Sequence, residues 1–252
     1  MRTTPPSTFE ELPDSEQRRV AAAARELAML ASSYATYVFF GNPHTDETHL
    51  SLGSAFVVEQ QGVVLVVTAD HVVAAYLAAR ESDVGVVFQV GNHLIDVESR
   101  LVLRDSVRDV ACVRIDEADI TRIGVNPYRA SNEWPSVAIA PGDYVQYCGF
   151  PAFYRRDIGR LDVSVVTLTG FVKVASVGEG FATCQIEREY LVQQGPEPIP
   201  PAGTRLGGMS GGPVLLRGVL EFPIVGLVSE FAENLDILRL SIFDWPLVTN
   251  VA

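Results

Sequence analysis

Cysteine is scarce in this chain, and its spacing excludes both a disulfide framework and a cysteine-based metal site. The 252 residues contain three cysteines, each within an apolar or strand-like stretch: Cys112, Cys148 and Cys184. An odd number of cysteines without a recognisable disulfide framework argues against a secreted protein that is stabilised by disulfides. No pair has metal-ligand spacing. The sequence therefore predicts buried, reduced cysteines, and it gives no reason to expect a metal or another cofactor.

Basic residues are outnumbered by acidic ones, 19 to 31, which gives a net charge of −12. No stripe of lysine or arginine is present, so a nucleic-acid partner is not expected. Long uncharged apolar runs are also missing. Residues 21–40 are mostly apolar but include Arg25 and Glu26, which argues against a membrane span. The N-terminus lacks the basic start and apolar stretch of a signal peptide, so we expect a cytoplasmic protein.

Helical periodicity is limited to two segments. After a proline-containing lead, residues 15–32 carry apolar residues at helical spacing, and residues 71–80 predict a second, short helix. From residue 34 onward the chain consists of about a dozen short, valine-rich runs separated by Gly, Pro, Asn and Asp. So many short strands with so little helix indicate an all-β barrel or sandwich.

Glycine is concentrated around a single serine. Residues 207–214 read GGMSGGPV, with Ser210 at the centre. Glycine loses more conformational entropy on folding than any other residue, and it permits backbone shapes that other residues avoid. The octet is therefore either a tight turn before a strand or a place where the backbone approaches a ligand closely.

Two further residues supply the partners that a reactive serine needs. His71 ends an apolar run, and Asp109 precedes the alternating run VACVRI. A serine hydroxyl is a weak nucleophile that needs an adjacent base. Histidine can take and return a proton near neutral pH, and a carboxylate can hold its ring in one tautomer. Asp70 and Asp105 are rivals for that carboxylate, but Asp105 lies in a polar stretch where we expect it to face water.

The stretches TADH, RDVACV and GGMSGGPV resemble, in this order, the three signatures of trypsin-like serine proteases of the chymotrypsin fold. GSAFVV, CGFP and IVGLVSE resemble further segments of the bacterial, Do-like (HtrA) members. The resemblance covers residues 34–245. It implies two packed six-stranded antiparallel β-barrels, about 34–125 and 136–245, in a peptidase domain 34–252 behind an N-terminal lead and helix, 1–33.

The resemblance also implies an activity and a site. The chain is expected to be a serine endopeptidase that acts on polypeptides, with Gly208 and Ser210 donating N–H groups to an oxyanion. The positions expected to bind substrate are Thr204, Ser229, Glu230 and Asp236. A carboxylate at Asp236 would favour Arg or Lys at P1, while a neutral pocket for small or aliphatic residues is an equal alternative.

One departure bears on activation. Many secreted trypsin-like enzymes carry an acidic residue before the serine, where Met209 stands here. Activation by pairing that acid with a new N-terminus is therefore not expected.

Two other interpretations of the function stay open, namely a protease effector activated by a regulatory protein partner and a catalytically silent binding module. An esterase is disfavoured because a strand, PVLL, follows Ser210. The sequence leaves the oligomeric state open.

Overall fold

The computed structural model describes residues 12–45, 50–131, 134, 138–157, 163–187, 190–192, 196–201, 203–217, 222–232 and 235–243. Most of the predicted N-terminal lead, parts of the proline-rich loop 193–203 and the residues after 243 lie outside the described residues.

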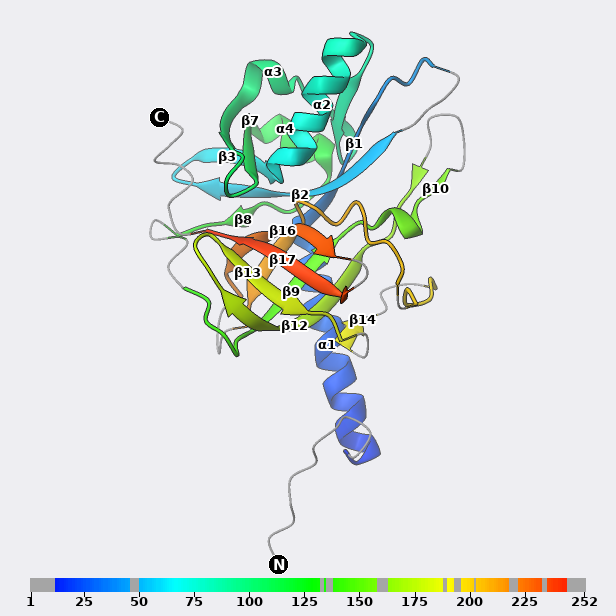
Figure 1. The fold of residues 1–252 in the computed structure, drawn as a ribbon, viewed down its shortest axis with the longest axis vertical. Coiled ribbons are helices and arrows are strands. Elements are labelled where there is room, and N and C mark those ends of the chain that lie inside the picture. Colours follow the sequence, from blue (N-terminus) through cyan, green and yellow to red (C-terminus); the bar gives the residue numbers. More distant parts are fainter. Residues whose placement is uncertain are drawn as a thin grey trace, which may run out of the picture.

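The first half of the chain forms a curved sheet whose strands run mostly antiparallel (Figure 1). Its strands are β1 (Ala35–Gly41), β2 (Ser51–Gln60), β3 (Val63–Thr68), β4 (Val87–Val90), β5 (His93–Leu94), β6 (Leu101–Asp105), β7 (Val110–Ile115) and β8 (Tyr128–Arg129). The order is β5-β4-β1-β2-β3-β7-β6, and β8 joins β2 in parallel. The β2–β3 hairpin turns through Gln61 and Gly62, both with positive φ, the backbone that a two-residue hairpin loop requires.

The second half forms a closed barrel. Its strands are β9 (Tyr144–Gly149), β12 (Leu168–Val177), β13 (Phe181–Gln185), β15 (Pro213–Leu216), β16 (Ile224–Ala232) and β17 (Ile237–Ile242), with β14 (Leu191–Val192) added to β12. The order is β13-β17-β16-β15-β9-β12, and the pairing of β12 with β13 closes the ring. A separate short hairpin joins β10 (Arg156–Asp157) to β11 (Val163–Ser164).

The predicted all-β class is confirmed, and the two halves differ in closure. The second half is a six-stranded barrel, whereas the first is a half-barrel whose edge strands, β5 and β6, do not pair within the described residues. The physical reason lies between those strands. Residues 93–99, HLIDVES, have a strand-like pattern, but only His93–Leu94 are in a strand, because Asp96 caps a helical turn, α3 (Val97–Arg100), that separates β5 from β6.

Helices pack at the periphery of both sheets. They are α1 (Asp14–Tyr34), α2 (Asp70–Ser82), α3, α4 (Glu117–Ile123) and the 3-10 helix η1 (Ala152–Tyr154). The two predicted helices are confirmed as α1 and α2, while the short α4 was not predicted. The C-terminal half of α1 buries Ala28 and Ala31 against the barrel, and its N-terminal half projects away (Figure 1). Within the described residues, no helix is long and apolar enough to cross a membrane.

The cysteines lie in the cores of the two halves, as predicted. Cys112, Cys148 and Cys184 are buried free thiols. Burial raises the pKa of each thiol, that of Cys184 to about 12. A thiol that stays protonated near neutral pH is a poor nucleophile, so these residues serve packing and not chemistry.

Candidate active site

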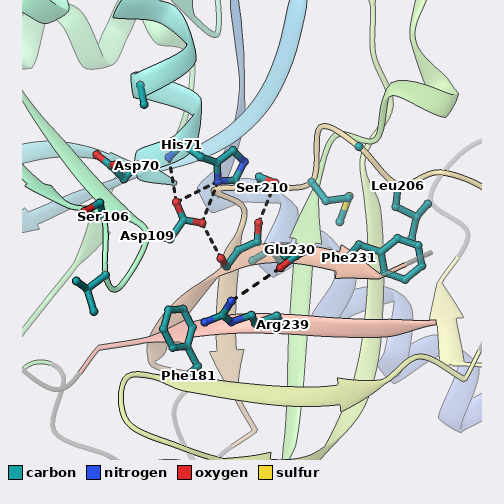
Figure 2. A pocket seen from close by; sticks show the side chains of 16 residues that line it. Asp70, His71, Ser106, Asp109, Phe181, Leu206, Ser210, Glu230, Phe231 and Arg239 are labelled. Carbon is teal, nitrogen blue, oxygen red and sulfur yellow. Dashed lines mark hydrogen bonds and ion pairs between the residues drawn. The ribbon is translucent and has the colours of Figure 1, made fainter. Parts of the chain in front are cut away.

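An open cleft of about 670 Å³ lies between the two halves of the molecule (Figure 2). The first half contributes the beginning of α2 and the loop before β7. The barrel contributes the glycine-rich loop before β15 and residues of β13, β16 and β17. Both halves therefore have to fold and pack before the site exists.

His71 is the second residue of α2, which starts almost immediately after β3 ends at Thr68. This abrupt change from strand to helix leaves the His71 side chain at the rim of the cleft, 54% exposed. Its Nδ1 lies 2.9 and 3.0 Å from the two carboxylate oxygens of Asp109. A proton on Nδ1 satisfies that contact, which leaves Nε2 with a free lone pair that can accept a proton.

Asp109 is held by groups from both halves of the molecule. It accepts hydrogen bonds from the backbone N–H of His71 at 2.9 Å and from Ser229 Oγ, on β16, at 2.6 Å. Its φ of +54° is unusual for a residue that is not glycine. Such a conformation persists when its surroundings fix it, and these contacts do so. Ser229 was expected to bind substrate, and the structure adds an orienting contact to Asp109.

The same contacts shift two pKa values in opposite directions. Burial of Asp109 opposes its ionisation, but hydrogen bonds from His71 and Ser229 outweigh burial and hold its pKa below the usual value. The hydrogen bond to Asp109 raises the pKa of His71 against the opposing effect of burial. The pair thus combines a carboxylate that stays charged with a histidine of increased basicity.

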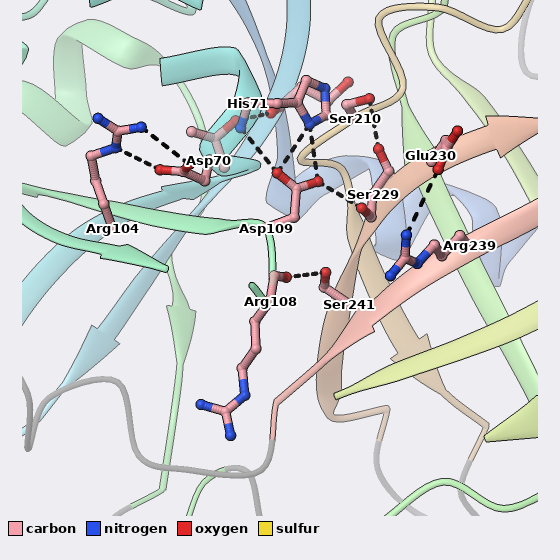
Figure 3. Close-up of polar contacts among 12 residues, drawn as sticks. Asp70, His71, Arg104, Arg108, Asp109, Ser210, Ser229, Glu230, Arg239 and Ser241 are labelled. Carbon is pink, nitrogen blue, oxygen red and sulfur yellow. Dashed lines mark hydrogen bonds and ion pairs between the residues drawn. The ribbon is translucent and has the colours of Figure 1, made fainter. Parts of the chain in front are cut away.

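Both rival aspartates have other partners, and Figure 3 shows that of Asp70, which is Arg104. Asp70 is buried and forms a bidentate salt bridge with Arg104, whose Nε and Nη2 lie 2.6 and 3.1 Å from its two carboxylate oxygens. Asp105 accepts from the backbone N–H groups of its own turn. Asp109 is therefore the carboxylate that bonds the His71 ring.

Ser210 faces the same cleft but does not bond His71 in this state. Its Oγ donates to the backbone carbonyl of Ser229 at 3.0 Å, and no hydrogen bond joins it to His71 in the part of the chain that the structure describes. A serine hydroxyl changes partner by rotation about a single bond. Catalytic contacts in structures without substrate are often long or unaligned.

The glycine-rich loop has a shape that other residues resist. Gly208 has φ +96°, and a Cβ there would lie 2.6 Å from the carbonyl oxygen of Phe150. Gly211 has φ +90°, and its Cβ would lie 2.0 Å from the carbonyl of Ser54. Among the described residues, the N–H groups of Gly208 and Ser210 have no acceptor. Backbone N–H groups without a protein acceptor are the kind of donor that can bind an anionic oxygen.

The expected substrate-binding positions separate into two groups. Ser229 and Glu230 line the cleft, whereas Thr204 and Asp236 are not among its lining residues. Asp236 lies in the turn before β17, where its backbone carbonyl accepts from the N–H of Ile186. The structure thus brings together around one cleft His71, Asp109, Ser210, Ser229 and Glu230. Gly208 is not itself a lining residue, but both of its neighbours in the chain, Gly207 and Met209, are.

Arg239 and Phe181 were not predicted, yet both line the cleft. The Arg239 guanidinium lies 3.7 Å above the Phe181 ring and 3.9 Å from the carboxylate of Glu230. Leu206 and Phe231 lie on the other side of Ser210 (Figure 2). In the structure, β16 and β17 pair so that Arg239 lies opposite Glu230. The sequence pattern identifies both strands, but it does not give the register in which they pair. Among the described residues, no cluster of His, Cys, Asp and Glu could hold a metal ion.

Comparison with known proteins identifies the family. The profile of the trypsin-like peptidase domain matches residues 53–218, more than half of the chain, so the chain belongs to this family. No curated protein shows significant similarity in sequence.

Solved structures similar in fold include the following three, each with a TM-score of 0.47. The active form of the Rv3671c protease from M. tuberculosis is 15% identical, over 88% of this chain and 81% of that one. The thermostable serine protease AL20 from an extremophilic microorganism is 17% identical, over 88% and 96%. A chain from a structure concerning the coupled folding and binding of the Sesbania mosaic virus VPg protein is 16% identical, over 82% and 85%.

The electrostatic coupling of His71 and Asp109 leads to a first prediction. Wild-type His71 should titrate above its ordinary pKa of 6.5. Asp109→Asn should lower that pKa, because a neutral amide neither attracts the imidazolium nor accepts a charge-assisted hydrogen bond. An NMR titration of the imidazole nitrogens measures both values.

The matched control is Asp105→Asn, which removes a carboxylate in the neighbouring turn that does not contact His71. The pKa of His71 should stay at its wild-type value in this variant. Equal shifts in the two variants would contradict the specific role given to Asp109.

Proposed function

We propose that this chain is a serine endopeptidase that cleaves peptide bonds through Ser210, His71 and Asp109. The observation that carries the proposal is the Asp109 carboxylate, which bonds His71 Nδ1 and leaves Nε2 free beside the cleft that contains Ser210. Membership of the trypsin-like peptidase family supports a protease with polypeptide substrates.

The reaction would proceed by acyl transfer. Ser210 Oγ leaves the Ser229 carbonyl, gives its proton to His71 Nε2 and attacks the substrate carbonyl carbon. The oxygen of that carbonyl becomes an oxyanion and accepts from the N–H groups of Gly208 and Ser210. His71 then protonates the leaving amine, and a water molecule, deprotonated by His71, hydrolyses the acyl-enzyme.

Typical free energies show how much the resting orientation of the Ser210 hydroxyl matters for the reaction. Exchanging one neutral hydrogen bond of Ser210 for another involves about 1 kcal/mol. Each oxyanion donor contributes about 100- to 1,000-fold to the rate, or about 3–4 kcal/mol. Breaking the hydrogen bond from Ser210 Oγ to the Ser229 carbonyl therefore costs little free energy compared with the stabilisation that two N–H donors give to the oxyanion. The proposal depends mainly on the shape of the loop and less on the resting position of Oγ.

The cleft favours a neutral P1 residue over a basic one. Leu206 and Phe231 give an apolar wall on the side of Ser210 opposite Asp109 (Figure 2). The Asp236 carboxylate, which was one reason to consider Arg or Lys at P1, is not part of the lining. Placing a charged side chain against an apolar wall without a partner is unfavourable.

The active arrangement would not require a zymogen step or a partner. Met209 is 1% exposed, and its side chain packs beside Gly149 where the loop meets β9. Packing of an apolar side chain thus holds the position at which secreted relatives use an ion pair. No residue of α1 lines the cleft, which argues against inhibition by that helix. The buried free thiols fit the cytoplasmic location expected from the sequence.

The second prediction concerns reactivity of the isolated protein. A fluorophosphonate probe should label the wild type, because Ser210 is activated by His71 and the oxyanion site is formed. Ser210→Ala and His71→Ala should both lose labelling. Intact-mass spectrometry measures the fraction of protein that carries the adduct, and its loss in Ser210→Ala assigns the adduct to Ser210.

The control for this experiment is Ser176→Ala, which removes an exposed serine on β12 outside the cleft and should label like the wild type. An unlabelled wild type would favour a partner-activated effector or a silent binding module. Labelling that survives Ser210→Ala would show that another residue is the nucleophile.

The third prediction concerns P1. Peptides with leucine, valine or alanine at P1 should be cleaved with kcat/KM at least about tenfold higher than those with arginine or lysine. Asp236→Asn should leave that ratio unchanged, because Asp236 does not line the cleft. A preference for basic residues that disappears in Asp236→Asn would overturn this view of the pocket.

A further inference from the structure

Ser54 is a buried residue of the first half that contacts the glycine-rich loop of the second. It lies on β2 with 0% exposure. Its Oγ donates to the carbonyl of Gly208 at 2.7 Å, and its backbone N–H donates to the carbonyl of Ser210 at 2.8 Å. One residue therefore holds the carbonyls on either side of Met209.

The remaining bonds of Ser54 fix the direction in which its hydroxyl donates. Its Oγ accepts from the N–H of Phe150 at 2.9 Å, which leaves the hydroxyl proton for Gly208. Its own carbonyl accepts from Thr68 Oγ1 at 2.7 Å, so β3 holds Ser54 in place. Every polar group of Ser54 thus has a partner, as buried groups require.

These bonds bear on the two N–H groups that face no protein acceptor. A residue has two soft backbone dihedrals, so fixing the carbonyls of Gly208 and Ser210 restricts the peptide unit between Met209 and Ser210, which carries the Ser210 N–H. The Gly208 N–H belongs to the unit before it, whose Gly207 carbonyl accepts from the N–H of Ala152 at 2.6 Å, so Ser54 holds the side of Gly208 that this bond does not reach. A flip of the unit between Gly208 and Met209 would carry the Gly208 carbonyl away from Ser54. The flip would leave the hydroxyl proton of the buried Ser54 without its acceptor, which is unfavourable.

Sterics restrict the loop from the other side. The space beside Gly208 is bounded by the Phe150 carbonyl and the side chain of Leu52. Phe150 and Leu52 flank the same junction of the two halves that Ser54 bridges. Gly208 can therefore keep its positive φ without a side chain, while Ser54 sets which way its carbonyl points.

We propose that Ser54 is a positioning residue that holds the loop Gly208–Ser210 in the shape in which both N–H groups can receive an oxyanion. The inference rests on the proposed serine-protease function for its catalytic consequence. The predicted effect of Ser54 on how well the loop is ordered can be measured whether or not the protein is catalytically active.

The test is Ser54→Ala, which removes the hydroxyl and keeps the backbone bonds to Ser210 and Thr68. We expect kcat to fall by about 10- to 100-fold, because the donors are less well ordered, with KM within about twofold. The acid limb of the pH profile should not move, since Ser54 does not touch His71 or Asp109. Hydrogen exchange of the amides in residues 205–212 should become faster.

The matched control is Thr169→Val, which removes a hydroxyl that is also fully buried, on β12 away from the cleft. Kinetics and exchange in 205–212 should match the wild type in this variant. Unchanged kcat and unchanged exchange in Ser54→Ala would overturn the inference. So would equal losses in Thr169→Val, or a shifted acid limb, since these indicate a general loss of structure.

Failure of the proposed function gives a different result. If the wild type neither cleaves peptides nor reacts with a fluorophosphonate, the protease proposal fails. Hydrogen exchange of the amides in residues 205–212 then tests the role of Ser54 independently of catalysis. Faster exchange in Ser54→Ala and not in Thr169→Val would still support its hold on the loop, and no difference would overturn it.

Discussion

The Asp109 carboxylate ties the two halves of this protein together at the point where chemistry is expected. His71, from the half-barrel, and Ser229, from the barrel, both donate to it. Because the donors come from different halves, the orientation of the histidine depends on how the halves pack. The unusual backbone of Asp109 is sustained by the same bonds. The site is therefore a property of the interface between two sheets and not of either sheet alone.

A second set of contacts across the same interface shapes the loop around Ser210. Glycines supply the positive φ values and the space, and Ser54 supplies bonds to the backbone. Met209 fills an apolar site beneath the loop without an ion pair. Together these features explain why so many glycines surround one serine: the loop must combine a close approach between the halves with two N–H groups left free.

Short-range sequence pattern was sufficient for most of the strands and for α1 and α2, because periodicity and flanking residues report local structure. It was insufficient where tertiary contacts decide. Ser54 lies in an ordinary strand pattern, and its bonds to residues more than 150 positions away leave no local signal. Arg239 enters the cleft through strand register. The open half-barrel follows from a helical turn of four residues, too short to be separated from a strand by periodicity.

The measurement that tests the central claim most directly is a crystal structure of the protein with a peptidyl boronic acid. The account predicts a bond from Ser210 Oγ to boron, with one boronate oxygen about 2.7–3.1 Å from the backbone nitrogens of both Gly208 and Ser210. His71 would face another boronate oxygen while keeping its bond to Asp109. An adduct whose oxygens avoid those two N–H groups, or the absence of any adduct at Ser210, would contradict the account.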